Sequence, residues 1–109
     1  MRLPFANAAI VEERKLIDYL LNPAHPQGHS KAAFFGQFGF ERERPDIFRH
    51  ALIEAASSAS MQEFITPYGT KYVGTGILRA PVGGDVQIVM VWMLRDGLPP
   101  PILVTAYPA

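Results

Sequence analysis

The stretch Ile102-Leu-Val-Thr-Ala-Tyr-Pro-Ala109 decides how the rest of the chain is arranged. Its apolar and β-branched residues predict a strand near Ile102–Tyr107, which needs earlier strands to hold it because chain ends fray unless they are tied down. Since side chains alternate along a strand, we expect Val104 and Ala106 on one face and Leu103, Thr105 and Tyr107 on the other. A core needs no hydroxyl groups, so the second face is where we look for function.

Three earlier runs also alternate between apolar and polar residues. They predict strands near Met61–Thr66, Lys71–Arg79 and Asp85–Leu94. Turn residues separate the four strands, in the segments 67–69, 81–84 and 96–101. Because the connections are short, the strands should form an antiparallel meander.

Two of these predicted strands carry further information. The run from Val86 to Leu94 is apolar at almost every position, which predicts a central strand covered on both faces. Gly74 and Gly76 remove side chains from one face of the preceding strand. That pattern predicts a bend or the close approach of another segment.

The first half of the chain has the spacing of helices. After an extended arm at Arg2–Val11, a helix is expected from Glu12 to the stop at Asn22-Pro23. Ser30 should cap a second helix from Lys31 to Phe38, and a third should run from Pro45 to Ser57. Helices followed by strands predict one α+β domain, residues 1–109, with N-terminal helices packed on one face of a four-stranded antiparallel sheet.

Composition excludes several classes of protein. The chain has 109 residues, 49% hydrophobic and 18% charged, which is typical of a single packed domain. Ten basic residues balance ten acidic ones, so charge alone gives no sign of nucleic-acid or membrane binding. Without cysteine there is no disulfide or thiolate chemistry. No run is long enough for a membrane helix and no signal peptide is visible, so we expect a cytoplasmic protein with no cofactor.

The strongest candidate site is Gly28-His-Ser-Lys31, at the start of the second predicted helix. The N-terminus of a helix presents free backbone N–H groups and partial positive charge, which suit an anion. Lys31 adds a full charge there, His29 titrates near neutral pH, and Ser30 supplies a substrate-binding hydroxyl. The alternative is that Ser30 only caps the helix and that His29 and Lys31 are solvated.

Two further groupings carry polar side chains. The turn before the second strand holds Tyr68, Thr70 and Lys71, which offer donors and a cation; the alternative is a hairpin turn whose aromatic rings cover the core. Thr105 and Tyr107 form the third grouping, unless the backbone satisfies their hydroxyls. No metal site is predicted. His25 and His29 are four residues apart, but Pro26 and Gly28 between them prevent the helix that would align two ligands.

Several of these segments resemble a small bacterial family of unknown function. The resemblance rests on the run 15–22, His25-Pro26, Gly28, Ser30-Lys31-Ala32, Phe35, Gly39-Phe40, Thr66-Pro-Tyr-Gly69, Lys71-Tyr72, Val91-Trp92 and Leu103-Val-Thr-Ala-Tyr-Pro108. Such proteins occur alone, as toxin partners of small antitoxins, and as C-terminal modules of larger toxins. More distantly, the chain is similar to the barnase–EndoU–colicin–RelE group of toxin ribonucleases, whose active residues come from both helices and sheet.

The resemblance implies a metal-independent endoribonuclease toxin with RNA as substrate and a small antitoxin protein as partner. In that interpretation His29 is the base or acid, Lys31 and Lys71 stabilise the phosphorane charge, and Thr105 and Tyr107 donate hydrogen bonds. Ser30, Tyr68 and Thr70 would bind substrate. The alternative is a non-catalytic protein-interaction module, either antitoxin-like or a homodimer closing over an exposed apolar sheet.

Overall fold

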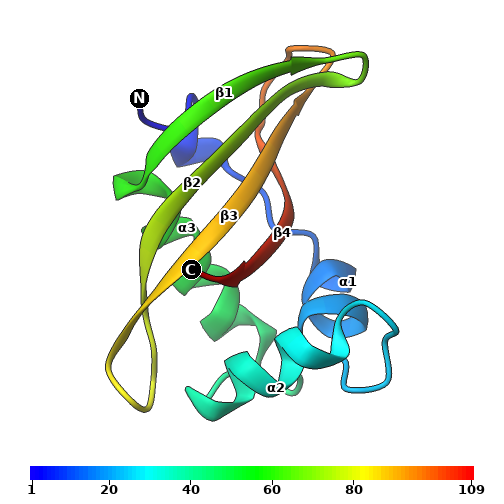
Figure 1. Ribbon diagram of the computed structural model, residues 1–109, viewed down its shortest axis with the longest axis vertical. Coiled ribbons are helices and arrows are strands. Elements are labelled where there is room, and N and C mark those ends of the chain that lie inside the picture. The colour runs from blue at the N-terminus through cyan, green and yellow to red at the C-terminus, as the bar shows by residue number, and fades with distance from the viewer.

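A single antiparallel sheet organises the molecule, and the computed structural model describes residues 1–109 (Figure 1). Its strands are β1 (Ser60–Thr66), β2 (Gly69–Arg79), β3 (Asp85–Arg95) and β4 (Ile102–Pro108). They are paired in the order β1-β2-β3-β4, and every pair is antiparallel. The predicted meander is therefore confirmed.

The helices precede the sheet, as an α+β domain requires. They are the short turn η1 (Ala6–Ala8), α1 (Glu13–Lys15) continued by the wider π-helical turn η2 (Leu16–Leu20), α2 (His29–Gln37) and α3 (Pro45–Ser58). Figure 1 shows α3 behind the sheet, with α1 and α2 beyond the β4 edge. The predicted fold class is confirmed. None of the helices is long and apolar enough to cross a membrane.

The second helix starts earlier than the sequence predicted. Its N-cap is Gly28, with no side-chain cap, so the prediction that Ser30 caps this helix is wrong. The backbone N–H of His29 already donates to the carbonyl oxygen of His25 at 2.9 Å, and the helix begins two residues sooner than predicted. A Cβ at Gly28 would overlap the carbonyl oxygen of Tyr19, so this close approach requires glycine.

The core lies between α3, α2 and one face of the sheet, which we call the core face. Trp92 of β3 and the aromatic pair Phe35 and Phe48 are fully buried, and the two phenylalanine rings are 4.7 Å apart. Gly76 of β2 allows α3 to approach closely. A Cβ there would lie 3.0 Å from the carbonyl oxygen of Ala55, which confirms the predicted close approach of another segment.

A β-bulge changes the faces of the last strand. Trp92 pairs with Leu103 but Val91 pairs with Thr105, so Val104 is an extra residue in β4. Leu103 and Ala106 are consequently both buried on the core face. The prediction that Leu103 shares a face with Thr105 is wrong, because one inserted residue reverses the alternation. Thr105 and Tyr107 do share a face, opposite the core.

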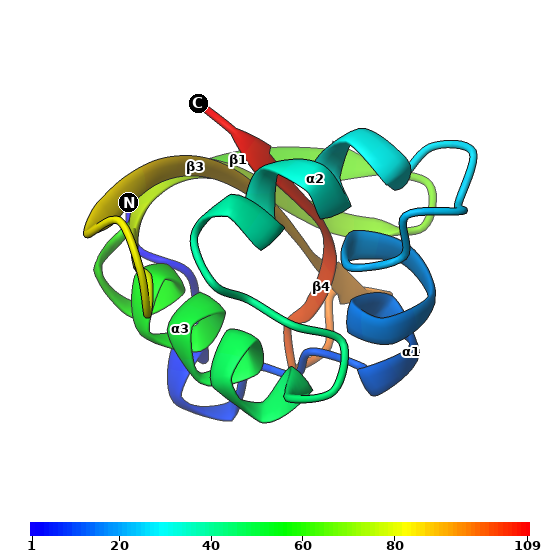
Figure 2. The ribbon, with the colours of Figure 1, turned by 90° about the horizontal axis from the view of Figure 1, so that it is seen from below.

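The sheet has a second face that no helix covers, which we call the outer face (Figure 2). Along β3 the even-numbered residues from Ile88 to Leu94 are buried, while Val89, Val91 and Met93 between them are only half-buried. The prediction that this strand is covered on both faces is wrong. Its outer-facing side chains are shielded only by their neighbours on β2 and β4, so apolar surface remains open to solvent.

The N-terminal arm holds the free edge of β4. Ile10 donates to Pro101 at 2.9 Å and accepts from the backbone N–H of Leu103 at 3.0 Å, which makes a short parallel bridge to the strand. The predicted extended arm is thus confirmed around Ile10 but is interrupted by the η1 turn. This bridge ends one residue before the bulge. Beyond the bulge, the side chain of Thr105 contacts η2.

Candidate functional site

Tyr19 lies at the centre of a polar cluster beside β4. Its hydroxyl is 3.0 Å from Oγ1 of Thr105, and the pair is partly buried. Tyr19 belongs to η2, which packs next to α2 at the β4 edge. A hydroxyl from the helical half of the chain thus meets one from the last strand, 86 positions away.

Two ammonium groups lie against the ring of Tyr19. Nζ of Lys15 is 5.3 Å from the ring centroid, and Nζ of Lys31 is 5.5 Å from it. Lys15 precedes Tyr19 by four residues, so the two side chains lie on one face of the helix. Lys31 also donates to the carbonyl oxygen of Gln27 at 3.1 Å, which directs it back over the loop. Cation–π contacts of this kind place two positive charges against one tyrosine ring.

His25 completes the cluster, and its hydrogen bonds define its tautomer. Its Nδ1 accepts hydrogen bonds from the backbone N–H groups of Gln27 and Gly28, each at 3.0 Å. Amide nitrogens only donate, so Nδ1 carries no proton and the neutral ring carries it on Nε2. The ring lies edge-on to Tyr19, with centroids 5.0 Å apart. His25 therefore offers one N–H donor and cannot act as a base at Nδ1.

These side chains surround a hollow of about 450 Å³, which we call the basic hollow. It is lined by Lys15, Tyr19, His25, Gln27, Val104 and Thr105. No carboxylate is among them, so one ammonium group, an N–H donor and two hydroxyls line the hollow without a negative charge, and Lys31 lies outside the lining, against the ring of Tyr19. Such a lining suits an anion with several oxygen atoms, as in a phosphate group. No group of three or more histidine, cysteine, aspartate or glutamate side chains could hold a metal ion.

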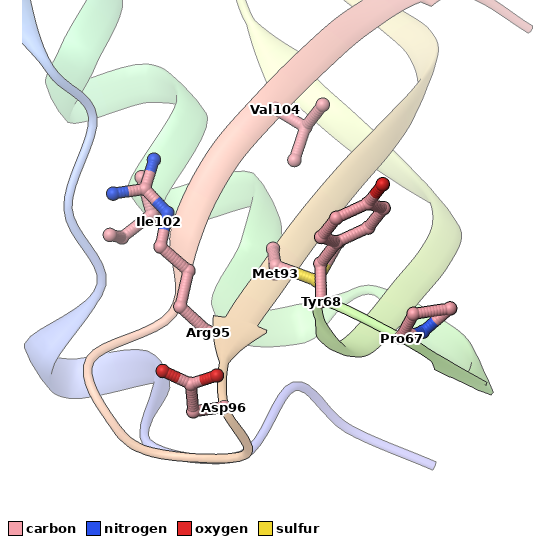
Figure 3. A pocket seen from close by; sticks show the side chains of 7 residues that line it. All are labelled: Pro67, Tyr68, Met93, Arg95, Asp96, Ile102 and Val104. Carbon is pink, nitrogen blue, oxygen red and sulfur yellow. The ribbon is translucent and has the colours of Figure 1, made fainter.

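A second hollow of about 490 Å³ adjoins the first on the outer face, and we call it the aromatic hollow (Figure 3). Its lining residues are Pro67, Tyr68, Met93, Arg95, Asp96, Ile102 and Val104. Val104, the bulged residue of β4, lines both hollows. The basic and aromatic hollows are therefore neighbours along the last strand.

Some of the predicted catalytic residues gather near the basic hollow. Thr105 lines it and Lys31 lies against its tyrosine. His29 is exposed at the start of α2, where its Nδ1 is 3.0 Å from the carbonyl oxygen of Pro26 and 3.2 Å from that of His25. Carbonyl oxygens only accept, so Nδ1 carries the proton and Nε2 is left free.

The other predicted catalytic residues lie further away on the outer face. Nζ of Lys71 is 5.5 Å from the centroid of the Phe64 ring. Lys71 lies on β2, two strands from Thr105, and it is opposite Met93 whereas Thr105 is opposite Val91, so the two positions are about 12 Å apart at the usual strand spacing and rise. Tyr107 is 37% exposed, opposite Val89 and beyond Thr105 along β4.

The predicted substrate-binding residues are also dispersed. Ser30 is exposed on α2, and Tyr68 is 78% exposed at the rim of the aromatic hollow. Thr70 pairs with Leu94, so it lies on the core face, opposite both hollows.

Sequence reasoning missed Tyr19 and Lys15 and considered His25 only as a metal ligand. A signal was present in the spacing of Lys15 and Tyr19, four residues apart on one helix just before a proline-rich loop. Nothing local could link them to Thr105, because that contact depends on the tertiary fold.

Taken together, these features define an α+β domain with helices before a four-stranded meander and a basic, carboxylate-free hollow beside its last strand. The chain belongs to the family described as Domain of unknown function (DUF6883), whose model matches residues 2–109. No curated protein matches the sequence.

One solved structure has a similar fold. It is a chain described as "Contact-dependent growth inhibition toxin - immunity protein complex from Klebsiella pneumoniae 342", with a TM-score of 0.70 and 15% sequence identity. The likeness covers 97% of each chain. At this identity the similarity is one of fold.

Proposed function

We propose that this protein is the toxin component of a bacterial toxin–antitoxin or polymorphic-toxin system and acts as a metal-independent endoribonuclease. The observation that carries the proposal is the basic hollow, where the ammonium group of Lys15, one N–H donor and two hydroxyls meet without a carboxylate, while a second ammonium group, that of Lys31, lies against the Tyr19 ring. The fold of a toxin–immunity complex chain adds support from architecture.

The chemistry is transfer of a phosphoryl group within RNA. The ribose 2′-oxygen attacks the neighbouring phosphorus, and the bond to the 5′-oxygen of the next nucleotide breaks. The products are a 2′,3′-cyclic phosphate and a 5′-hydroxyl. A base takes the proton of the 2′-hydroxyl, an acid gives one to the leaving oxygen, and each such group typically contributes about 10²–10⁴-fold.

The residues around the basic hollow divide these tasks. Lys15 and Lys31 stabilise the charge that develops on the phosphorane, which is the role preorganised cations perform best. His25 donates from Nε2 to a phosphate oxygen. We assign the base to His29, which is exposed at the start of α2 and is not a lining residue of the hollow, because its Nδ1 donates to backbone carbonyl oxygens and its Nε2 is free. The hydroxyl of Tyr19, paired with Thr105, is the acid we assign.

The more distant predicted residues bind the rest of the RNA. Lys71 and Tyr107 lie on the outer face, along which a strand leaving the basic hollow would run. Ser30 is the second residue of α2, directly after the loop that carries His25. We expect these residues to affect binding of RNA more than the rate of cleavage.

The test is cleavage of single-stranded RNA by the purified protein in the presence of a chelator. We expect products ending in 2′,3′-cyclic phosphate, and a fall in kcat of about 10²–10³-fold for Lys31→Ala, as for the loss of one charge-stabilising donor. Arg14→Ala is the matched control, because Arg14 is an exposed cation paired with Glu12 outside the hollow. Intact RNA with the wild-type protein, or equal rates for Lys31→Ala and Arg14→Ala, would refute the proposal.

A second candidate is the non-catalytic interaction module, and the outer face favours it. Phe64, Ile77, Val104 and Tyr107 are each between 37% and 43% exposed on this face. Several exposed apolar side chains on one face of a sheet are a feature of protein–protein contact surfaces. This candidate predicts a homodimer of twice 12.1 kDa by light scattering, or a stable complex with a small antitoxin, with no cleavage of RNA.

A further inference from the structure

We infer that the aromatic hollow is a binding slot for one unpaired RNA base, next to the phosphate held in the basic hollow. The inference rests on the proposed function, because it assumes that RNA is the ligand. It adds a base-binding subsite made by Tyr68, Met93 and Arg95, of which only Tyr68 was a candidate from its sequence pattern.

The first wall of the slot is an exposed aromatic ring on a rigid turn. Tyr68 is 78% exposed, an unusual position for a large side chain with no partner for its hydroxyl. Its backbone is nevertheless fixed. Oγ1 of Thr66 accepts from the N–H of Tyr68 at 3.2 Å and donates to the carbonyl oxygen of Gly69 at 2.8 Å. A ring held out in solvent by an ordered backbone is preorganised for stacking.

The floor and the far wall also suit a base. In Figure 3 the side chain of Met93 lies below the Tyr68 ring, and the side chain of Arg95 lies across the hollow from that ring. Met93 and Ile102 give an apolar, polarisable floor. Arg95 is 61% exposed, and its guanidinium is 3.9 Å from Glu12, so it is oriented but not buried. Unstacked RNA bases are commonly held between an aromatic ring and an arginine.

The rim supplies partners for the edge of a base. Asp96 adopts a left-handed conformation, with φ of 55°, and its backbone N–H donates to the carbonyl oxygen of Tyr68 at 3.2 Å. The turn after β3 is thereby pinned to the turn before β2, so the two walls keep their separation. Arg95 donates and the carboxylate of Asp96 accepts, which together match the mixed donors and acceptors of a nucleobase.

The position of the slot ties it to the basic hollow. Val104 lines both hollows, so a base in one and a phosphate in the other would belong to the same or adjacent nucleotides. On one side of Val104 the lining is mostly polar and carries Lys15 without a carboxylate, and on the other it is mostly apolar, with Arg95 and Asp96 at its edge. This division is typical of sites that bind single-stranded RNA, where charge holds the backbone and stacking holds the bases.

Methionine-methyl NMR tests the inference directly. The protein is labelled with 13C at its methionine methyl groups and titrated with each of the four ribonucleoside 5′-monophosphates. We expect the methyl resonance of Met93 to move upfield through the ring current of the base. Met90 is fully buried on the core face and should not move, which makes it an internal control. Ribose 5-phosphate, which lacks a base, should leave Met93 unshifted.

Variants then measure the contribution of stacking. The probe is a 2′-O-methylated tetranucleotide, which binds but has no 2′-hydroxyl with which to be cleaved. Tyr68→Leu should weaken its binding about 5- to 150-fold, the range expected for losing one aromatic stack, while Tyr68→Phe should stay within about 2-fold of wild type. Because the ring is exposed, neither change should disturb folding.

The outcomes separate this inference from the proposed function. Tyr68-dependent binding of RNA that is never cleaved would support the slot and refute the nuclease. Cleavage at equal kcat/KM by wild type and Tyr68→Leu, with no shift of Met93, would support the nuclease and overturn the slot. A Met93 shift caused only by an antitoxin protein, and by no nucleotide, would also overturn it.

Discussion

The contact between Tyr19 and Thr105 gives the sharpest test of how the site is assembled. It is a neutral hydrogen bond of 3.0 Å between two partly buried hydroxyls, and it joins η2 to β4. Such a bond contributes a net ~1 kcal/mol to stability, because folding exchanges it for bonds to water. Tyr19→Phe and Thr105→Val each remove one hydroxyl with little change in shape.

The two substitutions should not be additive. Each single variant loses the same bond, so each should be destabilised by ~1 kcal/mol, and the double variant should lose little more than either. The coupling free energy is then ~1 kcal/mol, and each single variant should melt about 4 °C lower for a domain of this size.

Urea denaturation followed by tryptophan fluorescence measures this coupling. Trp92 is the only tryptophan and is fully buried, so its emission reports global unfolding. The control is a second cycle that combines Tyr19→Phe with Thr75→Val, since Thr75 is exposed on β2 and does not contact Tyr19. A coupling below ~0.3 kcal/mol in the Tyr19–Thr105 cycle, equal to that of the control, would show that the bond does not hold the site together.

Two further predictions concern packing and pH. Gly76→Ala should lower the free energy of unfolding in urea by ~1–3 kcal/mol, because the added Cβ would press on α3 and on Met90. Gly36→Ala in α2 is the control: its Cβ would meet no atom within 4 Å, so it should raise the free energy of unfolding by ~0.5–1 kcal/mol. Burial and the hydrogen bond to Glu63 raise the pKa of Tyr72 from 10.0 to about 12. Below pH 10 the free energy of unfolding should therefore not depend on this group, and between pH 10 and pH 12 it should fall as the unfolded chain loses the phenol proton first. Tyr72→Phe should remove this part of the fall in stability. An identical pH profile for the variant would contradict the assignment.

Much of the fold could be predicted because it depends on local patterns. Alternation and turn residues place the four strands within two residues of their observed ends, and Pro45 marks the start of α3 correctly. The bulge at Val104 could not be predicted, because an apolar run is compatible both with a regular strand and with a strand that contains one extra, unpaired residue. The N-cap of α2 was predicted at Ser30 instead of Gly28, because the need for glycine there arises from a tertiary contact. Gly28 is needed for its contact with Tyr19, which is invisible in the sequence.

The candidate site was only partly predictable. Thr105 stood out because hydroxyls are unusual on a face expected to be apolar, and Lys31 because it begins a helix. Their common neighbour Tyr19 looked like an ordinary helical residue, since its significance comes from a contact 86 positions along the chain. Patterns of residues indicate which groups are available for chemistry, but only the packing of α1, α2 and β4 decides which of them meet.

The β-bulge explains why this fold can place a site beside a buried strand. Leu103 and Ala106 are both buried on the core face although they are three positions apart. In a regular strand, residues three positions apart point to opposite faces. The extra residue Val104 allows both to face the core and directs Thr105 to the outer face, where Tyr19 reaches it around the edge of the sheet. Ile10 holds the strand immediately before this point through two backbone hydrogen bonds, to Pro101 and from Leu103. Bulges commonly re-aim side chains next to functional sites, and here one residue separates the basic hollow from the aromatic hollow.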